Sequence, residues 1–279
     1  MGTPLKDWDI NIYRGVLTGC NEAFIISTEK RNEILANCKT EDERKRTEEL
    51  IRPILRGRDI KRYGYEWANL WLIWVPWHFP LHLDNSIQGA SVKAEKAFET
   101  QYPAVYNHLL KYKTQLSARN KAETGIRYEW YALQRWGANY WEEFSKPKII
   151  FQEIVQESQF TMDKYGQFIC NDTGRIITGS DLYHILGIMN SSLFFFAIKR
   201  FYGGGNLGEH GVRMKHTFFE KFPCVKPCKE IEEASKGVLE QNINKQSDHI
   251  DRIVESLYQL SKPESDFIHK TLCQQDSLQ

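Results

Sequence analysis

The residues from Arg52 to Tyr63 carry a strong positive charge. The stretch RPILRGRDIKRY holds four arginines and one lysine beside a single carboxylate, Asp59. The longer range 44–62 has eight basic and three acidic residues, in a chain whose formal net charge is only +1. Because phosphates are neutralised locally, a basic face predicts contact with a polyanion even in a neutral chain. The alternative is a solvated helix face whose arginines are balanced by nearby glutamates.

A second basic region lies further along the chain. It contains few acids, and its basic residues are Lys111, Lys113, Arg119, Lys121, Arg127 and Arg135. The last fifty residues, in contrast, are balanced or slightly acidic, and aromatic residues make up 13% of the chain. Repeated basic segments beside aromatic ones favour a nucleic-acid surface over a single solvated face.

No segment has the residue pattern of a common catalytic site. The chain has no GxxxxGK[ST] loop, GxSxG elbow, HExxH pair or zinc-deaminase pattern. The glycine-rich segment GGGNLGEHG is weak evidence for a phosphate cradle, because it follows an apolar helix rather than a strand. Asp163 and Lys164 lie at an apparent turn and not at nuclease spacing. We therefore expect a binding module without a catalytic residue of its own.

The cysteines indicate neither a disulfide framework nor a metal site. Six cysteines are scattered through 279 residues, and only Cys224 and Cys228 lie close together. No second Cys or His pair stands at zinc spacing, so we expect reduced thiols and no metal. No apolar run approaches the roughly 18–20 residues that span a bilayer, and the first residues do not resemble a signal peptide. We expect a cytoplasmic protein.

The apolar periodicity predicts mixed strands and helices. Two strands around a tight turn are expected in 8–28, a helix ending near Pro53, and a buried strand in the Trp-rich run that follows. Helices are expected in 91–119, and Pro103 opens the second of them. A strand is expected from Lys148 and a hairpin in 160–172. One apolar helix is expected to begin at Asp181. The order favours an α+β fold, with a recognition domain in 1–228 and a helical segment in 229–279 that packs on it or on a catalytic domain.

Taken in order, several segments resemble one known family. They are YRGVLTGCNEAFII (13–26), IRPILRGRDIKRY (51–63), LSAR (116–119), WYALQR (130–135), KPKIIFQEI (146–154), LGIMNSSLFFFAIK (186–199) and DRIVESLYQLSKPE (251–264). The chain is thereby similar to the TaqI-like C-terminal specificity domain, the target-recognition domain of type II and IIG restriction-modification enzymes. The match is specific because seven segments occur in series over nearly the whole chain.

The resemblance implies a function in DNA recognition. It implies sequence-specific binding of duplex DNA for a DNA adenine N6-methyltransferase, possibly fused to an endonuclease. The chain lacks the glycine loop and the Asn-Pro-Pro-Tyr motif of such methyltransferases, and no two prolines are adjacent. The resemblance thus places S-adenosylmethionine and catalysis in another part of the parent protein. The implied partners are double-stranded DNA and that methyltransferase or endonuclease domain, with no membrane.

Residues that fit both the resemblance and the chemistry of DNA contact form the expected site. Cations reach phosphates or guanine edges, hydroxyl and amide groups bond phosphates or bases, and aromatic rings stack on displaced bases. The expected contacts are Thr18, Asn21, Arg56, Arg58, Lys61, Arg62, Arg119, Tyr128, Arg135, Lys146, Lys148, Lys199, Arg200, Asn206, Arg213 and Lys215.

Each group has a structural alternative. The arginines of 56–62 can pair with Asp59 and nearby glutamates, and Thr18 and Asn21 can belong to an ordinary turn. Core or cap roles compete for Arg119, Tyr128 and Arg135, while Lys199 and Arg200 can complement a helix C-terminus. A protein-interaction module, docking a partner through the Trp-rich segment and the C-terminal helices, is the alternative function. A complete enzyme with an unrecognised site is a third.

Overall fold

The computed structural model describes residues 2–203, 211–241 and 247–276 of the chain. It confirms the expected α+β class, with several small sheets and a helical C-terminal part. Within these ranges no single helix is long and apolar enough to cross a membrane; the pair Leu182–Met189 and Ser192–Arg200, bent by 64°, meets that criterion only when joined.

A four-stranded antiparallel sheet separates two apolar cores. Its order is β10-β8-β12-β2, with bounds Phe160–Asp163, Lys148–Gln152, Gly174–Gly179 and Ile10–Arg14. Alternate residues of the two central strands point to opposite faces, as strand geometry requires. Ile150 and Ile176 therefore join the first core, while Ile149 and Ile177 join the second. Both faces of the two central strands are buried, so the residues in the middle of each strand are apolar.

The first core is completed by a second sheet and the helices of the N-terminal half. The sheet has the order β11-β4-β7-β3, with bounds Ile169–Cys170, Ile51–Leu55, Leu70–Ile73 and Ile25–Ser27. The helices are α1 (Asn21–Phe24), α2 (Thr28–Ala36), α3 (Glu41–Leu50), α4 (Val92–Gln101), α5 (Pro103–Leu110) and α6 (Lys113–Ala118), with 3-10 turns η2 (Gly57–Asp59) and η3 (Trp141–Ser145). Pro103 opens α5 as expected, because its missing N–H is not needed there.

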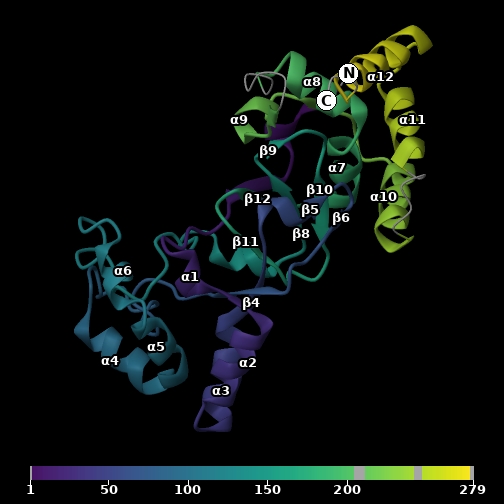
Figure 1. The fold of residues 1–279 in the computed structure, drawn as a ribbon. Helices are drawn as coiled ribbons and strands as arrows, with labels where there is room; N and C mark the ends of the chain where they lie inside the picture. The colour runs from purple at the N-terminus through teal and green to yellow at the C-terminus, as the bar shows by residue number, and fades with distance from the viewer. Residues whose placement is uncertain (1, 204–210, 242–246, 277–279) are drawn as a thin grey trace.

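The second core is covered by the C-terminal helices. These are α7 (Leu182–Met189), α8 (Ser192–Arg200), α9 (His216–Phe219), α10 (Lys229–Gln241), α11 (Ser247–Leu257) and α12 (Lys262–Asp276). Short strands accompany them: β5 (Ile60–Lys61), β6 (Gly64–Tyr65), β9 (Ile154–Val155), β13 (Val212–Arg213), β1 (Thr3–Pro4) and β14 (Pro223–Cys224), besides the turn η1 (Leu5–Asp7). Ile231 of α10 and Ile250 of α11 are fully buried in this core. In Figure 1, α10, α11 and α12 follow one side of the molecule.

Several predicted elements differ from those observed. Residues 8–28 do not form a hairpin, because β2 and β3 enter different sheets and α1 lies between them. The helix expected to end near Pro53 ends at Leu50, and the residues 51–55 that follow, Pro53 included, form β4. The expected hairpin of 160–172 is also wrong, since β10 pairs with β8 and β11 pairs in parallel with β4. Local pattern could not reveal which sheet each strand joins.

The apolar segment from Asp181 forms two helices rather than one. Asn190 and Ser191 lie at the break, and the Ser191 hydroxyl caps α8 by accepting a hydrogen bond from the Phe194 N–H at 3.1 Å. The Asn190 amide donates to the Phe160 carbonyl at 2.9 Å and accepts from the Phe160 N–H at 3.1 Å. This exchange joins the break between α7 and α8 to the first residue of β10.

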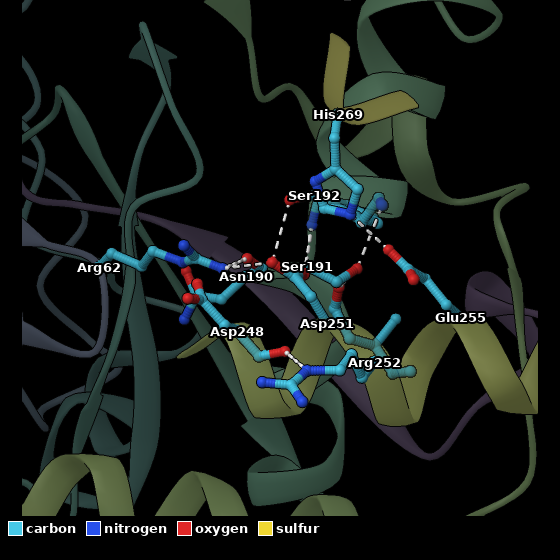
Figure 2. A network of polar contacts seen from close by, with 11 residues as sticks. Arg62, Asn190, Ser191, Ser192, Asp248, Asp251, Arg252, Glu255 and His269 are labelled. Atoms are coloured by element: carbon cyan, nitrogen blue, oxygen red, sulfur yellow. Dashed lines mark hydrogen bonds and ion pairs between the residues drawn. The ribbon is translucent and has the colours of Figure 1, made fainter. Parts of the chain in front are cut away.

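Arg62 and Asp251 connect the sheets to the C-terminal helices. Arg62, which follows β5, donates to the Asn190 carbonyl at 2.8 Å and to Asp251 on α11 at 3.4 Å. Asp251 also accepts from the Ser192 N–H at 2.7 Å and the Ser192 hydroxyl at 3.0 Å. Figure 2 shows these side chains converging from three separate segments. The carboxylate of Asp251 is therefore the point at which α11 is fixed.

Candidate nucleic-acid interface

Loops from six parts of the chain meet at one end of the central sheet. Arg14 ends β2 opposite Arg175, and Gly174 pairs with Gln152 at the end of β8. We call this surface the loop face, and it comprises Arg14, Arg56, Arg58, Arg135, Gln152, Asn171, Thr173, Arg175 and Arg213. In Figure 1, α1, β11, β12 and β9 lie between the α4–α6 helices and α9.

Backbone hydrogen bonds hold these loops together. The Leu17 N–H and carbonyl exchange hydrogen bonds with Arg135 at 2.8 and 2.9 Å. The Glu153 N–H donates to the Thr173 carbonyl at 3.1 Å, and the Met214 N–H donates to the Glu153 carbonyl at 2.6 Å. The segments that carry the arginines are therefore connected directly to one another, and their positions are fixed relative to the sheet.

Two glycines permit the close approach of these loops. A β-carbon at Gly15 would lie 1.9 Å from the Asn171 carbonyl oxygen, so there is no room for a side chain at this position. At Gly57 a β-carbon would lie 3.0 Å from the Gln152 side chain and from the Thr173 hydroxyl. Gly57 thus brings the turn carrying Arg56 and Arg58 against the loops that end β8 and β11.

The loop face is predominantly cationic. In residues 14–21, 56–59, 134–135, 152–153, 171–175 and 213–214, six cationic side chains stand against three acidic ones. Within the described part of the chain, the buried Nε atoms of Arg135 and Arg213 have no acceptor. Such donors are costly to leave unpaired, but as buried atoms they are not themselves open to a ligand.

Arg175 is an internal support for the loop face. Its guanidinium donates to the carbonyls of Asp172 at 2.9 Å and Gly174 at 3.0 Å, and it pairs with the Glu153 carboxylate. Burial lowers the pKa of Arg175, whereas the Glu153 carboxylate acts in the opposite direction. Because Arg175 is buried, we assign it the role of shaping the 171–175 loop rather than contacting a ligand.

Arg56 and Arg58 have different roles although they are two residues apart. Arg56 pairs with Asp59 at 2.7 Å, the structural alternative expected from the sequence, and this hydrogen bond raises the pKa of the Arg56 guanidinium. Arg58 is exposed and has no ion-pair partner among the residues that the structure describes. The turn η2 therefore presents Arg58 outward while the Arg56–Asp59 pair holds the turn.

Thr18 and Asn21 lie beside the loop face at the start of α1. The buried Thr18 hydroxyl donates to the Asn21 side-chain oxygen at 2.6 Å, while Asn21 itself is exposed. Gly19 between them has a φ of +72°, a conformation that glycine adopts without strain. Asn21 is thus available to a ligand, and Thr18 orients it.

Three residues expected at the interface are buried instead, and these expectations are corrected. Arg119 donates to the carbonyls of Thr18, Trp130 and Ala132 at 2.6, 2.6 and 2.8 Å, and burial lowers its pKa. Tyr128 is fully buried and stacks on Trp77 with ring centroids 4.8 Å apart. Lys148 is fully buried and donates to Asp163 at 2.6 Å. In this fold none of these three side chains can reach DNA.

Other expected contacts lie away from the loop face. Lys146 pairs with Glu143 at 2.7 Å near the opposite end of β8, and Lys61 lies 3.7 Å from Glu66. Arg62 belongs to the Asp251 network already described. Lys199 and Arg200 end α8, and Lys215 caps α9 next to Arg213. Asn206 lies outside the described residues.

Sequence reasoning missed five residues of the loop face. These are Arg14, Gln152, Asn171, Thr173 and Arg175. Arg14 was visible within the YRGVLTG segment, where an arginine immediately precedes a glycine. The other four become neighbours only through the register of β8 and β12, which no local pattern reveals.

A sequence model of the TaqI-like C-terminal specificity domain matches residues 52–223 of this chain. The match covers more than half of the 279 residues, including the turn with Arg58 and the strand with Arg213. The chain belongs to the TaqI-like specificity-domain family. This confirms the family expected from the seven sequence segments.

The chain spans only part of the length of the larger proteins to which it is similar. Over 217 residues it is 25% identical to the type II methyltransferase M.MjaIV of Methanocaldococcus jannaschii, covering 73% of this chain and 60% of that protein. The fold is similar to that of MmeI, a type IIL restriction-modification enzyme solved in complex with DNA. That similarity has a TM-score of 0.56 at 17% identity, over 99% of this chain and 36% of MmeI. The type IIG endonuclease BpuSI gives a TM-score of 0.43 at 10% identity, over 95% of this chain and 32% of BpuSI.

Proposed function

We propose that this specificity domain binds duplex DNA sequence-specifically through its loop face. The observation that carries the proposal is the convergence of Arg14, Arg58, Arg135 and Arg213 from four separate segments on one end of the central sheet. Arginines attract phosphates at any sequence and also form bidentate contacts with guanine O6 and N7. Family membership supports the same function.

Neutral hydrogen-bonding groups on the loop face supply base readout. Gln152 and Asn171 carry amides, which pair with adenine N6 and N7, and the hydroxyl of exposed Thr173 can bond either a base or a phosphate. Thr173 donates to the Asn171 side-chain oxygen at 2.8 Å, so the two side chains are oriented together. Their position beside cationic groups places candidate base-reading and phosphate-binding groups side by side.

Methyl transfer belongs to another part of the parent protein in this proposal. The parent is a DNA adenine N6-methyltransferase, possibly fused to an endonuclease, and its catalytic part binds S-adenosylmethionine and the flipped adenine. The specificity domain holds the duplex while that part acts. A cytoplasmic location agrees with this function.

Selection from a randomised duplex library tests the proposal. The wild-type chain and the Arg14→Gln/Arg58→Gln variant are selected at two salt concentrations, with the exposed pair Arg44→Gln/Arg252→Gln as the matched control. We expect the wild type and the control to enrich the same short motif, and the loop-face variant to lose it. Enrichment of the same motif by all three proteins would contradict the proposal.

A protein-docking function is the second candidate, and one observation favours it. Phe201 and Phe267 are 74% and 62% exposed, and both rings contact Phe196 at 5.8 and 6.0 Å. This aromatic cluster on α8 and α12 is suited to a protein partner such as the catalytic domain. Loss of binding to the separately expressed catalytic domain in Phe267→Ser, with DNA selection unchanged, would establish that both functions occur on different surfaces.

A further inference from the structure

A second concave site lies near the other end of the central sheet. It is a cavity of about 220 Å³ bordered by α3, by the end of β7 and the loop after it, and by η3. Seven of its residues carry the argument below: Arg46, Glu49, Arg52, Trp74, His82, Tyr102 and Trp141. The site joins the basic segment of 44–62 to the Trp-rich segment, two features of the sequence that the loop face uses only in part.

Aromatic rings form the walls of this cavity. Trp74 and Trp141 meet with centroids 6.2 Å apart and planes inclined at 60°. Tyr102 borders another part of the cavity, beside Phe79 at 4.9 Å. Aromatic rings at a cavity can stack on flat rings such as nucleobases, at about 1–3 kcal/mol per base. The walls therefore suit a planar aromatic group.

Two guanidinium groups border the same cavity. Arg46 lies over the Tyr102 ring at 5.6 Å and donates to the Gln101 carbonyl at 3.1 Å. Arg52 lies over the Trp74 ring at 6.0 Å and donates to the Gly166 carbonyl at 2.8 Å. Because both are held by backbone carbonyls, little side-chain entropy is lost when an anion binds. Glu49 is the one carboxylate among the residues described as lining the cavity.

Two residues that line the cavity carry polar atoms without partners. Within the described part of the chain, the buried His82 Nδ1 and Arg46 Nε atoms have no hydrogen-bond partner. Burial lowers the pKa of the His82 imidazole, with the Pro80 carbonyl opposing that effect, so the neutral ring is favoured. Buried polar groups normally find a partner, and a bound ligand supplies one.

We propose that this cavity binds one nucleotide, with its base against Trp74, Trp141 and Tyr102 and its phosphate on Arg46 and Arg52. The fork of an arginine matches phosphate oxygens in a bidentate manner. The cavity is smaller than the roughly 300–1,000 Å³ of drug-sized sites, which limits the enclosed part to one base. Glu49 accepts a hydrogen bond from an exocyclic amino group, which favours adenine, guanine or cytosine over thymine.

The nucleotide can come from two sources with the same chemistry. It is either a free nucleoside monophosphate or a nucleotide unstacked from a DNA strand. The proposal does not depend on DNA binding at the loop face, since Arg46 and Trp141 are not part of it. A negative result for nucleotide binding in the cavity would therefore leave the proposal of DNA binding at the loop face unaffected, and the reverse also holds.

Quenching of tryptophan fluorescence measures binding to the full chain. In one set of titrations the protein receives dAMP, dTMP or inorganic phosphate. In a second set it receives a duplex carrying one bulged adenosine or a fully paired duplex. We expect saturable quenching by dAMP, by the bulged duplex or by both, which identifies the source. We also expect dAMP to bind at least several-fold more tightly than dTMP and phosphate.

Variants assign the binding to this cavity. Arg52→Gln and Trp141→Leu should each weaken it at least tenfold, while Arg44→Gln, on the same helix as Arg46 but outside the cavity, should leave it unchanged. Thermal unfolding shows whether each variant is folded. If one of the two cavity variants is unfolded, Arg46→Gln is used in its place. Absence of quenching by both dAMP and the bulged duplex would overturn the proposal, as would equal binding of phosphate and dAMP.

Discussion

Gly15 lies against the carbonyl of Asn171 so closely that a β-carbon at position 15 would be 1.9 Å from that oxygen. The contact joins the end of β2 to the loop between β11 and β12, and the Gly15 N–H donates to the Gly174 carbonyl at 3.1 Å. Two loops of the proposed DNA-binding surface thus depend on one position without a side chain.

Gly15→Ala should destabilise the fold and disturb the loop face. The added methyl group must displace backbone, and overpacking of this kind costs about 1–3 kcal/mol. We expect a lower midpoint in urea unfolding together with weaker DNA binding. Gly64→Ala is the control, because a β-carbon there meets nothing within 4 Å, and it should change neither quantity. Unchanged stability of Gly15→Ala would mean that the two loops do not pack as described.

Arg58→Ala should weaken DNA binding without altering stability. The side chain is exposed and has no ion-pair partner within the described residues, so its removal leaves no buried charge. If Arg58 contacts a phosphate, the plot of log affinity against log salt concentration should become shallower, its slope falling in magnitude by about 1. Arg44→Ala, which removes an exposed charge paired with Glu48 on α3, should leave the slope unchanged. Equal slopes for wild type and Arg58→Ala would place Arg58 outside the interface.

Asp251→Ala should loosen α11 from the rest of the domain. The carboxylate accepts three hydrogen bonds, from Arg62 and from the N–H and hydroxyl of Ser192. Loss of a buried charged acceptor costs about 2–3 kcal/mol. Hydrogen exchange should accelerate in α11 and at the start of α8, whereas Arg252→Ala, exposed on the same helix, should leave exchange as in the wild type. Uniform exchange changes across the whole chain would contradict a local role.

Stability should decrease in mild acid because of buried histidines. The His184 Nε2–H donates to the Val225 carbonyl at 3.0 Å, and Nδ1 accepts from the Cys228 N–H at 3.3 Å, an arrangement that requires the neutral ring. Burial lowers the pKa of His184, and likewise those of His82 and His108. The unfolded chain takes up protons near pH 6.5 and the folded chain only at lower pH, so the free energy of unfolding falls below about pH 6.5.

Urea unfolding at several pH values checks this dependence. His184→Gln should reduce the loss of stability between neutral and mildly acidic pH, because one of the three imidazoles whose pKa is lowered in the fold is gone. His249→Gln, exposed on α11, should leave the dependence as in the wild type. An identical dependence in His184→Gln and the wild type would show that folding does not shift the pKa of His184, and would contradict this account.

The sequence predicted where helices and strands lie better than it predicted which strands pair with one another. The α4 and α5 boundary at Pro103 and the start of β8 at Lys148 agree with the structure, because each has a local cause in cap chemistry or apolar pattern. The parallel pairing of β11 with β4 brings together residues more than a hundred positions apart. No turn residue specifies such a contact, so the hairpin expected in 160–172 was wrong.

The candidate site was predicted in part for the same reason. Charge identified Arg58 and Arg213, which lie on the loop face, but charge also selected Arg119 and Lys148, which are buried. The buried pair differ in having internal acceptors, the Thr18 carbonyl and the Asp163 carboxylate, that only tertiary packing provides. Counting charges therefore identifies segments that belong to an interface, but it does not identify which of their side chains face outward.

The central claim, that the loop face contacts duplex DNA, is tested most directly by photocrosslinking. A photoreactive benzoylphenylalanine replaces the exposed Thr173 in one protein and the exposed Gln88, outside the loop face, in another. Both are irradiated with the duplex enriched in the library selection. We predict crosslinked DNA from position 173 that decreases as salt is added, and none from position 88. Crosslinking from position 88 with none from position 173 would contradict the account.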